Sequence, residues 1–232
     1  MINLQRSADR RYIKTGSQEM WMSFDLENVQ DPFHRGFRAL GLLNEVRLSP
    51  GAEFKQPSDG DQESVTYVRE GSLVVRHKPR RDEFIGPGCC QRAGTRRSPA
   101  HGAQVGSPSG GAHLFVSSMT SNPQEAEFAF ERKHYSFSDR RGILRLIASR
   151  EGRAASLRLQ HDVRIYSSLL DPGHHVVHEL SVGRGAWLHV VAGRVQLVDH
   201  TLQAGDGASV DDELALSFTA LDPSEILLFD LA

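Results

Sequence analysis

Cysteine, lysine and long apolar stretches are all scarce in this chain of 232 residues. The only two cysteines, Cys89 and Cys90, are adjacent, so they cannot form an ordinary framework disulfide, and a reducing compartment is the default expectation. No apolar run approaches the roughly 18 residues that would cross a bilayer. The N-terminal stretch MINLQRSADRR also lacks the apolar centre of a secretory signal. We therefore expect a cytoplasmic protein with no membrane partner.

Excess positive charge is missing as well. The formal net charge is -2, which removes any general electrostatic argument for nucleic acid as a partner. The basic residues are 23 arginines and 4 lysines, and arginine suits bidentate contacts with anions. Hydrophobic residues make up 39% of the chain, so we expect a globular protein and not a disordered one.

Helical periodicity is rare, whereas strand signals are frequent. Short segments rich in β-branched or aromatic residues, bounded by Gly, Pro, Asp or Ser, predict strands. These segments cover residues 38–48, 64–70, 72–77, 112–119, 156–160, 163–170, 186–192, 194–200 and 225–231. Regular short strands separated by turn signals are typical of a β-sandwich or β-barrel.

An internal repeat indicates two such units. The motif LSPG at 48–51 recurs as LDPG at 170–173, and EGSLVV at 70–75 recurs as AGRVQL at 192–197, both with an offset of 122. Each copy then runs through a hairpin to a glycine turn, and the first hairpin is about five residues longer. The sequence therefore predicts two similar all-β units in one chain.

The polar, proline-marked segment at 121–142 predicts the connection between the units. We expect an N-terminal domain at 1–125, a linker at 126–134 and a C-terminal domain at 135–232. Whether the N-terminal or the C-terminal strand crosses into the other unit stays open.

The turn, strand and hairpin frame around Gly71 resembles that of cupins. The more specific resemblance is to pirin-like bicupins of the cupin superfamily, through FDLENVQDPFHRGFRALGLLNEVRLSPG at 24–51, TYVREG at 66–71 and GPGCCQR at 86–92. The second half, up to the terminal LLFDL, looks most like the YhaK-type branch of that family. This resemblance implies an all-β fold of two cupin barrels, each a double-stranded β-helix or jelly roll.

The pirin frame also offers four metal ligands, two histidines in a first motif and a histidine and a glutamate in a second. Counting along this chain from Gly51 for the first motif and from Gln91 for the second, the four positions hold Pro57, Asp59, His101 and Ala103. Proline and alanine side chains cannot coordinate Fe, Ni or Zn, and a histidine with one loop carboxylate rarely suffices.

We therefore expect a degenerate site without a functional metal. Asp59, His101 and the neighbouring Glu63 remain weak candidate ligands, and the alternative is Fe, Ni or Zn in the N-terminal barrel. The same three residues are candidate acids and bases for metal-free catalysis. A histidine cluster at His174, His175 and His178 predicts a surface or partly buried polar group and not a metal site. Strand alternation would place His174 and His178 on one face and His175 on the other.

Two further groups are candidates for chemistry. Cys89 and Cys90 would point to opposite faces of a strand, and they are either two small apolar residues or include a redox-sensitive thiol. Arg92, Arg96 and Arg97 lie in a predicted loop and are candidates for anion binding.

Three functions are compatible with these residues. The favoured one is a pirin-like bicupin that binds a small molecule or a protein partner without a metal, with a redox-responsive regulatory role as a variant. The resemblance also implies a quercetin 2,3-dioxygenase-like, metal-dependent enzyme. The third is a metal-free enzyme that uses Asp59, Glu63 and His101. The residues leave open whether the chain is an enzyme, but they favour a binding protein, whose ligand the sequence does not name.

Overall fold

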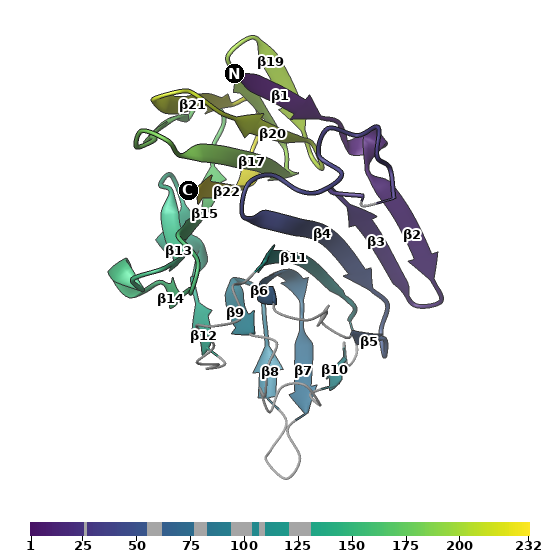
Figure 1. Cartoon of the computed structure of the whole chain (residues 1–232). Helices are drawn as coiled ribbons and strands as arrows, with labels where there is room; N and C mark the ends of the chain where they lie inside the picture. Colours follow the sequence, from purple (N-terminus) through teal and green to yellow (C-terminus); the bar gives the residue numbers. More distant parts are fainter. Residues whose placement is uncertain (26, 55–61, 77–82, 94–103, 107–109, 121–130) are drawn as a thin grey trace. The chain divides into compact units, whose positions relative to one another are not determined.

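Strands make up almost all of the regular structure in the computed structural model of this chain (Figure 1). The described residues are 1–25, 27–54, 62–76, 83–93, 104–106, 110–120 and 131–232. Their contacts divide the chain into two units. The N-terminal unit comprises Arg11–Gly36 and Leu40–His134, and the C-terminal unit comprises Met1–Arg10, Phe37–Ala39 and Tyr135–Ala232.

The N-terminal unit contains two antiparallel sheets. The larger sheet has the order β12 (Glu131–His134), β9 (Cys89–Ala93), β6 (Gln62–Gly71), β11 (Ala112–Thr120), β4 (Leu40–Leu48), β3 (Gln18–Met22) and β2 (Arg11–Thr15). The smaller sheet has the order β5 (Glu53–Phe54), β10 (Gln104–Gly106), β7 (Leu73–Arg76) and β8 (Glu83–Ile85).

The C-terminal unit repeats this plan with one exception. Its larger sheet has the order β1 (Ile2–Gln5), β20 (Gly207–Val210), β17 (Gly185–Ala192), β22 (Ser224–Leu231), β15 (Val163–Leu170), β13 (Arg145–Ser149) and β14 (Leu157–Arg158). The last two of these strands pair parallel. The smaller sheet has the order β16 (His175–Glu179), β21 (Ala215–Ala220), β18 (Arg194–Leu197) and β19 (His200–Gln203). The short helical pieces are η1 (Ser7–Asp9), α1 (Phe137–Arg140) and η4 (Arg153–Ala155).

Each unit encloses an apolar core between its two sheets, because successive side chains of a strand alternate between its faces. In the C-terminal unit, for example, Leu188 of β17 and Ile226 of β22 share one buried cluster with Phe218 of β21 in the smaller sheet. In the N-terminal unit, Val68 and Leu114 share a cluster with Leu73 in the same way. The all-β architecture of two barrels that the repeat predicts is therefore confirmed. Among the described residues, no helix has the length and apolar character needed to pass through a membrane.

Glycine turns show the repeat directly. Gly71 and Gly193, which the offset of 122 relates, have φ angles of 72° and 77°. Gly51 and Gly173, related by the same offset, have φ angles of 77° and 79°. Left-handed backbone of this kind is accessible to glycine with little strain, so both copies use the same residue for the same turn.

The outermost strands β1 and β12 of the two larger sheets lie outside the domain ranges expected for those units from the sequence. Strand β1 pairs antiparallel with β20, so residues 1–10 belong to the C-terminal unit (Figure 1). Residues 131–134, expected in the linker, form β12 and pair with β9. The strand expected at 194–200 ends at Leu197, because Val198 takes a φ of 51° in a turn.

Candidate functional site

The inward face of the N-terminal barrel changes from apolar to polar along its strands. At one end of the larger sheet the inward side chains belong to the apolar core, as Val68 and Leu114 do. At the other end of the sheet the inward side chains are neutral and polar, and the strand register places them close together. They are Asn44, Gln62, Ser64, Thr66, Gln91 and Ser118.

These side chains offer hydrogen-bond donors and acceptors without charge. Ser118 Oγ donates to Gln62 Oε1 at 3.0 Å, and Gln91 Oε1 accepts from Arg132 Nη2 at 3.3 Å. The Oδ1 atom of Asn44, a residue that is 3% exposed, has no hydrogen-bond partner among the described residues. A buried amide oxygen of this kind favours a ligand that can donate a hydrogen bond.

Ionisable side chains of the same strands lie on the opposite face. Glu63 alternates with inward Ser64, and its Oε1 atom is 3.5 Å from Nε of buried Arg92. His113 Nε2 is 2.9 Å from Glu45 Oε1, on that same outward face. Within the part of the chain that the structure describes, the four central strands β4, β6, β9 and β11 therefore point neutral groups inward and charged groups outward.

Only one of the three acid and base candidates can be placed. Glu63 faces away from the barrel core, whereas Asp59 and His101 lie outside the described residues. Arg92 lies in strand β9 and not in the loop expected from the sequence, and Arg96 and Arg97 lie outside the described residues. Joint action of the acid and base candidates, and anion binding by the arginines, stay predictions.

The two free cysteines point to opposite faces of β9, as alternation predicts. Cys89 is half-buried and packs against the core of the N-terminal barrel, while Cys90 is buried with 1% exposure on the other face. Redox activity of either thiol stays a prediction, because packing of this kind suits a small apolar side chain equally well.

At the four positions that the resemblance to pirins assigns to metal ligands, only two side chains carry a donor atom. All four positions lie outside the described residues, but the sequence fixes their chemistry. Pro57 and Ala103 carry no donor atom, which leaves Asp59 and His101. Protein sites for Fe, Ni or Zn generally need three or four nitrogen, oxygen or sulfur donors. The described residues themselves contain no group of three or more His, Cys, Asp or Glu suited to a metal ion.

Of the neighbouring histidines at 174, 175 and 178, His175 and His178 lie on opposite faces of β16, as alternation predicts. His175 is exposed, and its Nδ1 atom is 3.0 Å from Thr219 Oγ1. His178 lies on the same face of β16 as buried Val176, and its Nε2 atom is 3.1 Å from Oδ2 of Asp230. They therefore do not form one cluster.

None of the six inward polar residues is a candidate from the sequence alone, nor is Asp230. The sequence nevertheless contains a signal for the six residues and for Asp230. Ser64 and Thr66 precede Val68 at spacings of two, and Asp230 follows Ile226 and Leu228 in the same way. Polar residues that continue a core-facing alternation mark the polar end of a barrel interior.

Known proteins match the chain along its whole length. A family model described as the quercetinase C-terminal cupin domain matches residues 146–231. A quercetin 2,3-dioxygenase of Escherichia coli K12 is 28% identical over 231 residues, which cover 100% of this chain and 99% of the relative. The pirin-like protein YhaK of the same strain is 25% identical over 219 residues, 90% of each chain.

A solved structure supports the same relationship. The crystal structure of the bacterial pirin YhhW from Escherichia coli, in complex with nickel(II), superposes with a TM-score of 0.86 at 26% identity. The superposition covers 100% of this chain and 99% of YhhW. The identity to YhaK, whose branch the sequence favours, is slightly lower than the identity to the dioxygenase.

Proposed function

Because the chain is a pirin-like cupin protein, we propose that it binds a small neutral organic molecule inside its N-terminal barrel without a tightly held metal ion. The observation that carries this proposal is the group of neutral polar side chains on the inward face of the larger sheet. A ligand with hydroxyl and carbonyl groups would match these donors and acceptors. Sites of this kind commonly combine an apolar wall with a few placed polar groups.

The absence of donor atoms at Pro57 and Ala103 supports the metal-free part of the proposal. A ligand in this barrel would be oriented by hydrogen bonds and not by coordination. Each such bond contributes about 0.5–1.5 kcal/mol, so the proposal predicts moderate affinity that falls when single polar groups are removed.

Two neighbouring serines allow a matched test. Ser118 and Ser117 are both buried residues of β11, but Ser118 faces inward to Gln62 and Ser117 donates outward to Val65 O at 3.3 Å. Quercetin, the polyhydroxylated compound after which the dioxygenase relatives are named, is the probe, and binding is followed by the change in its absorbance spectrum and by the thermal shift of the protein. We expect Ser118→Ala to weaken binding about threefold to tenfold, and Ser117→Ala to leave the affinity unchanged. Equal weakening by both variants would contradict the proposal.

A quercetinase-type oxidoreductase is the second candidate. The quercetin 2,3-dioxygenase of Escherichia coli and the nickel complex of YhhW favour it, and the donor set opposes it. The decisive measurement is metal content per chain after growth with Fe, Ni, Mn and Zn, together with O₂ uptake in the presence of quercetin. Near-stoichiometric metal that is lost in His101→Ala, with O₂ uptake, would establish this second candidate. We expect neither metal nor O₂ uptake.

A further inference from the structure

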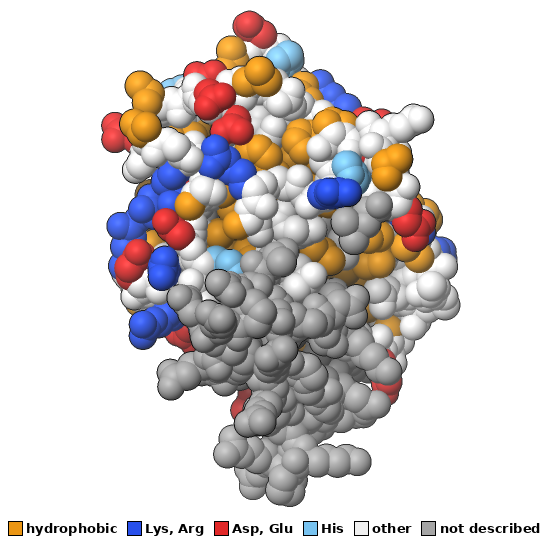
Figure 2. All heavy atoms as spheres, viewed as in Figure 1, with side chains coloured by type: hydrophobic (Ala, Val, Ile, Leu, Met, Phe, Trp, Pro, Cys, Tyr) orange, Lys and Arg blue, Asp and Glu red, His pale blue; other side chains and the backbone are white. Residues whose placement is uncertain are grey.

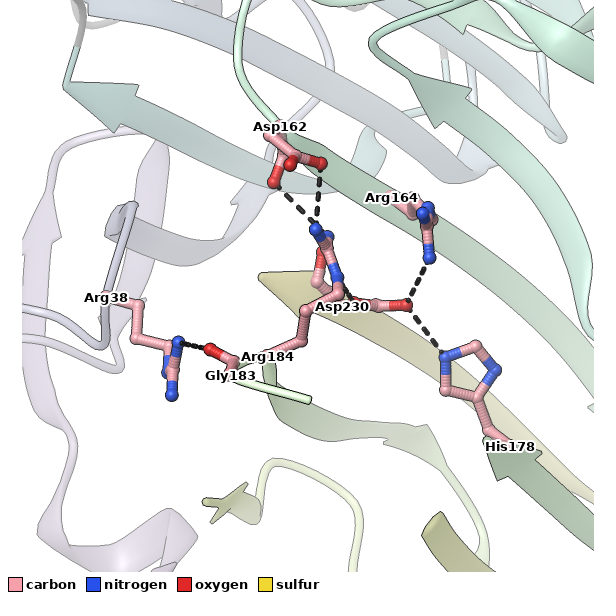
Figure 3. A network of polar contacts seen from close by, with 7 residues as sticks. All are labelled: Arg38, Asp162, Arg164, His178, Gly183, Arg184 and Asp230. Atoms are coloured by element: carbon pink, nitrogen blue, oxygen red, sulfur yellow. Dashed lines mark hydrogen bonds and ion pairs between the residues drawn. The ribbon is translucent and has the colours of Figure 1, made fainter. Parts of the chain in front are cut away.

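The inward face of the C-terminal barrel ends in a buried carboxylate. Asp230 follows the core residues Ile226 and Leu228 on the same face of β22, and it is 0% exposed. Polar groups from three other segments meet it there (Figure 3). An isolated carboxylate in such a place would be strongly disfavoured, so its partners decide what the site can do.

Arginine and histidine side chains surround this carboxylate. Arg184 donates from Nε to Oδ1 of Asp230 and from Nη2 to its carbonyl oxygen at 2.9 Å. Arg164 Nη1 lies 3.3 Å from Oδ2, and His178 Nε2 lies 3.1 Å from the same atom. Arg184 also donates from Nη1 to Oδ1 of Asp162 at 2.8 Å. Arg184 is thereby held between two carboxylates.

The turn that carries Arg184 is fixed separately. Arg38 Nη1 donates to the carbonyl oxygen of Gly183 at 2.7 Å (Figure 3). Arg38 Nη2 pairs with Asp211 at 2.6 Å. The neighbouring Arg184 is buried, with its side chain 8% exposed. Arg184 therefore stabilises the network, and its guanidinium is already engaged by partners within the chain.

Arg164 and His178 differ from Arg184 in this respect. The Arg164 side chain is 25% exposed, and only its Nη1 atom has a partner among the described residues. His178 uses Nε2, and its Nδ1 atom has no partner in the described part of the chain. Both side chains thus retain polar atoms for a ligand, and Asp230 holds both in place.

Tyr166 completes the group. It lies on the same face of β15 as Arg164, and its ring is 4.9 Å from that of His178 in an edge-on arrangement. It also packs against the apolar core of the barrel. Burial, with the charge of Asp230, raises the pKa of Tyr166, so its hydroxyl keeps its proton. A ligand at Arg164 and His178 would therefore have an aromatic wall beside it.

The charges favour an anion and oppose a cation. Both oxygens of Asp230 already accept hydrogen bonds from cationic or imidazole donors. Arg164 and Arg184 would repel a metal ion, and Arg153, which interacts with Tyr166, adds a third guanidinium beside two carboxylates. The residues 140–164 as a whole contain seven arginines against two acidic residues. Figure 2 shows basic side chains gathered over β13 and β14, a field that would attract anions.

We propose that this end of the C-terminal barrel binds the carboxylate of a small organic acid, which accepts hydrogen bonds from the Arg164 guanidinium and from Nδ1–H of His178 in its imidazolium form, while Tyr166 contacts its apolar part. A planar carboxylate matches the guanidinium fork. A carboxylate carries one charge, which suits the small excess of cations better than a dianionic phosphate does. The half-buried tyrosine favours an organic body on the ligand. This site is separate from the N-terminal barrel and does not depend on the function proposed for it.

Benzoate is the probe, and benzamide is its uncharged counterpart of nearly the same shape. Titration of the full-length, ¹⁵N-labelled protein is followed by amide chemical shifts. We expect saturable shifts for residues 164–166, 178 and 230 with benzoate, and none with benzamide. Arg164→Gln and His178→Gln should each weaken benzoate binding about tenfold, the effect of losing one charge-assisted hydrogen bond.

The matched control is Arg150→Gln, which removes one charge from the same basic segment, at an exposed residue that forms no hydrogen bond or ion pair with the group among the described residues. It should leave the affinity within about twofold. Equal binding of benzamide, or equal weakening by Arg150→Gln and Arg164→Gln, would overturn the proposal in favour of nonspecific adsorption. Tighter binding of inorganic phosphate than of benzoate would overturn the choice of a carboxylate. The comparison of benzoate with benzamide needs no variant, so it holds even where a variant fails to fold.

Discussion

Asp230 shows how a single buried charge depends on its neighbours. Burial alone would raise the pKa of its carboxyl group, but hydrogen bonds from His178 and Arg184 lower the pKa below its ordinary value. Burial alone would lower the pKa of Arg184, and its bonds to Asp230 and Asp162 raise that pKa instead. Each charge is therefore stable in the fold because the other is present.

Removing one partner from such a pair leaves the other uncompensated. We expect Asp230→Asn to lower the free energy of unfolding by about 3–5 kcal/mol, because Arg184 then keeps a buried charge with a weaker acceptor. The measurement is urea unfolding at pH 7. Asp222→Asn is the control, since Asp222 pairs with Arg194 at the surface, where water screens the pair, and it should leave the free energy of unfolding nearly unchanged. Similar losses in the two variants would refute this account of the network.

The lowered pKa of Asp230 also predicts how stability depends on pH. A carboxylate whose pKa is lower in the folded state stabilises the fold above its unfolded pKa of about 3.9, and this contribution is lost as the pH falls through the folded pKa. The difference in unfolding free energy between wild type and Asp230→Asn should therefore shrink below about pH 4. Unfolding curves at several pH values measure it, and a difference that stays constant down to acid pH would be incompatible with ionised Asp230.

For a single residue, the sequence predicts the face of the strand on which its side chain lies better than it predicts the residues which that side chain contacts. The opposite orientations of Cys89 and Cys90, and the separation of His175 from His178, follow from the two-residue period of a strand. The partnership of Asp230 with Arg184 does not, because the two residues lie 46 positions apart and only the pairing of β17 with β22 brings their segments together. Contacts across a sheet depend on register, which a local pattern does not encode.

The glycines of the repeat differ in what surrounds them. A methyl group on Gly71 would overlap the carbonyl oxygen of Gly111, and one on Gly193 would overlap that of Pro223. A methyl group on Gly51 or on Gly173 would meet no heavy atom within 4 Å. The repeat thus contains two kinds of glycine turn, one crowded and one open, in the same places of both barrels.

This difference predicts four substitutions in two matched pairs. Gly51→Ala and Gly173→Ala should each cost about 1–2 kcal/mol, the strain of alanine in left-handed backbone. Gly71→Ala and Gly193→Ala should cost about 1–3 kcal/mol more, because the added methyl group also forces the neighbouring strand apart. Urea unfolding of the four variants tests the order. Equal losses of unfolding free energy at crowded and open turns would mean that backbone strain alone determines the cost and that packing around the glycine contributes nothing.

Elements with alternating apolar residues could be predicted from the sequence, and short polar ones could not. The segment 163–170 forms β15 with the expected bounds, since its branched and aromatic residues alternate around a core. The strand expected at 156–160 is limited to β14, and β12, with the sequence ERKH, has no strand signal at all. Such a strand forms because the edge of a neighbouring sheet offers backbone hydrogen bonds, and the strand propensity of its own residues contributes little.

For the molecule as a whole, each larger sheet has an outermost strand that lies outside the domain range expected for that unit from the sequence. The C-terminal unit takes β1 beside β20, and the N-terminal unit takes β12 beside β9, in equivalent positions of the two sheets. Buried Asp206 anchors the first arrangement, because it accepts Arg6 Nη1 at 2.9 Å and the Ser7 amide at 2.7 Å. The expected boundary at residue 135 therefore describes most of the second barrel, and the contribution of residues 1–10 requires a pairing that only the folded chain shows.

Deletion of residues 1–10 tests whether β1 is part of the C-terminal barrel or merely lies on its edge. Without β1, the backbone of β20 at Gly207–Val210 loses its outer partner, and Asp206 loses the cation that balances its buried charge. We expect hydrogen exchange in β20 to accelerate at least about tenfold, because these amides would open without global unfolding. Strand β9 is the internal control, since β12 still covers it and its exchange should not change. Faster exchange in both strands would mean that the deletion destabilises the whole chain, and unchanged exchange in β20 would mean that β1 contributes nothing to this barrel.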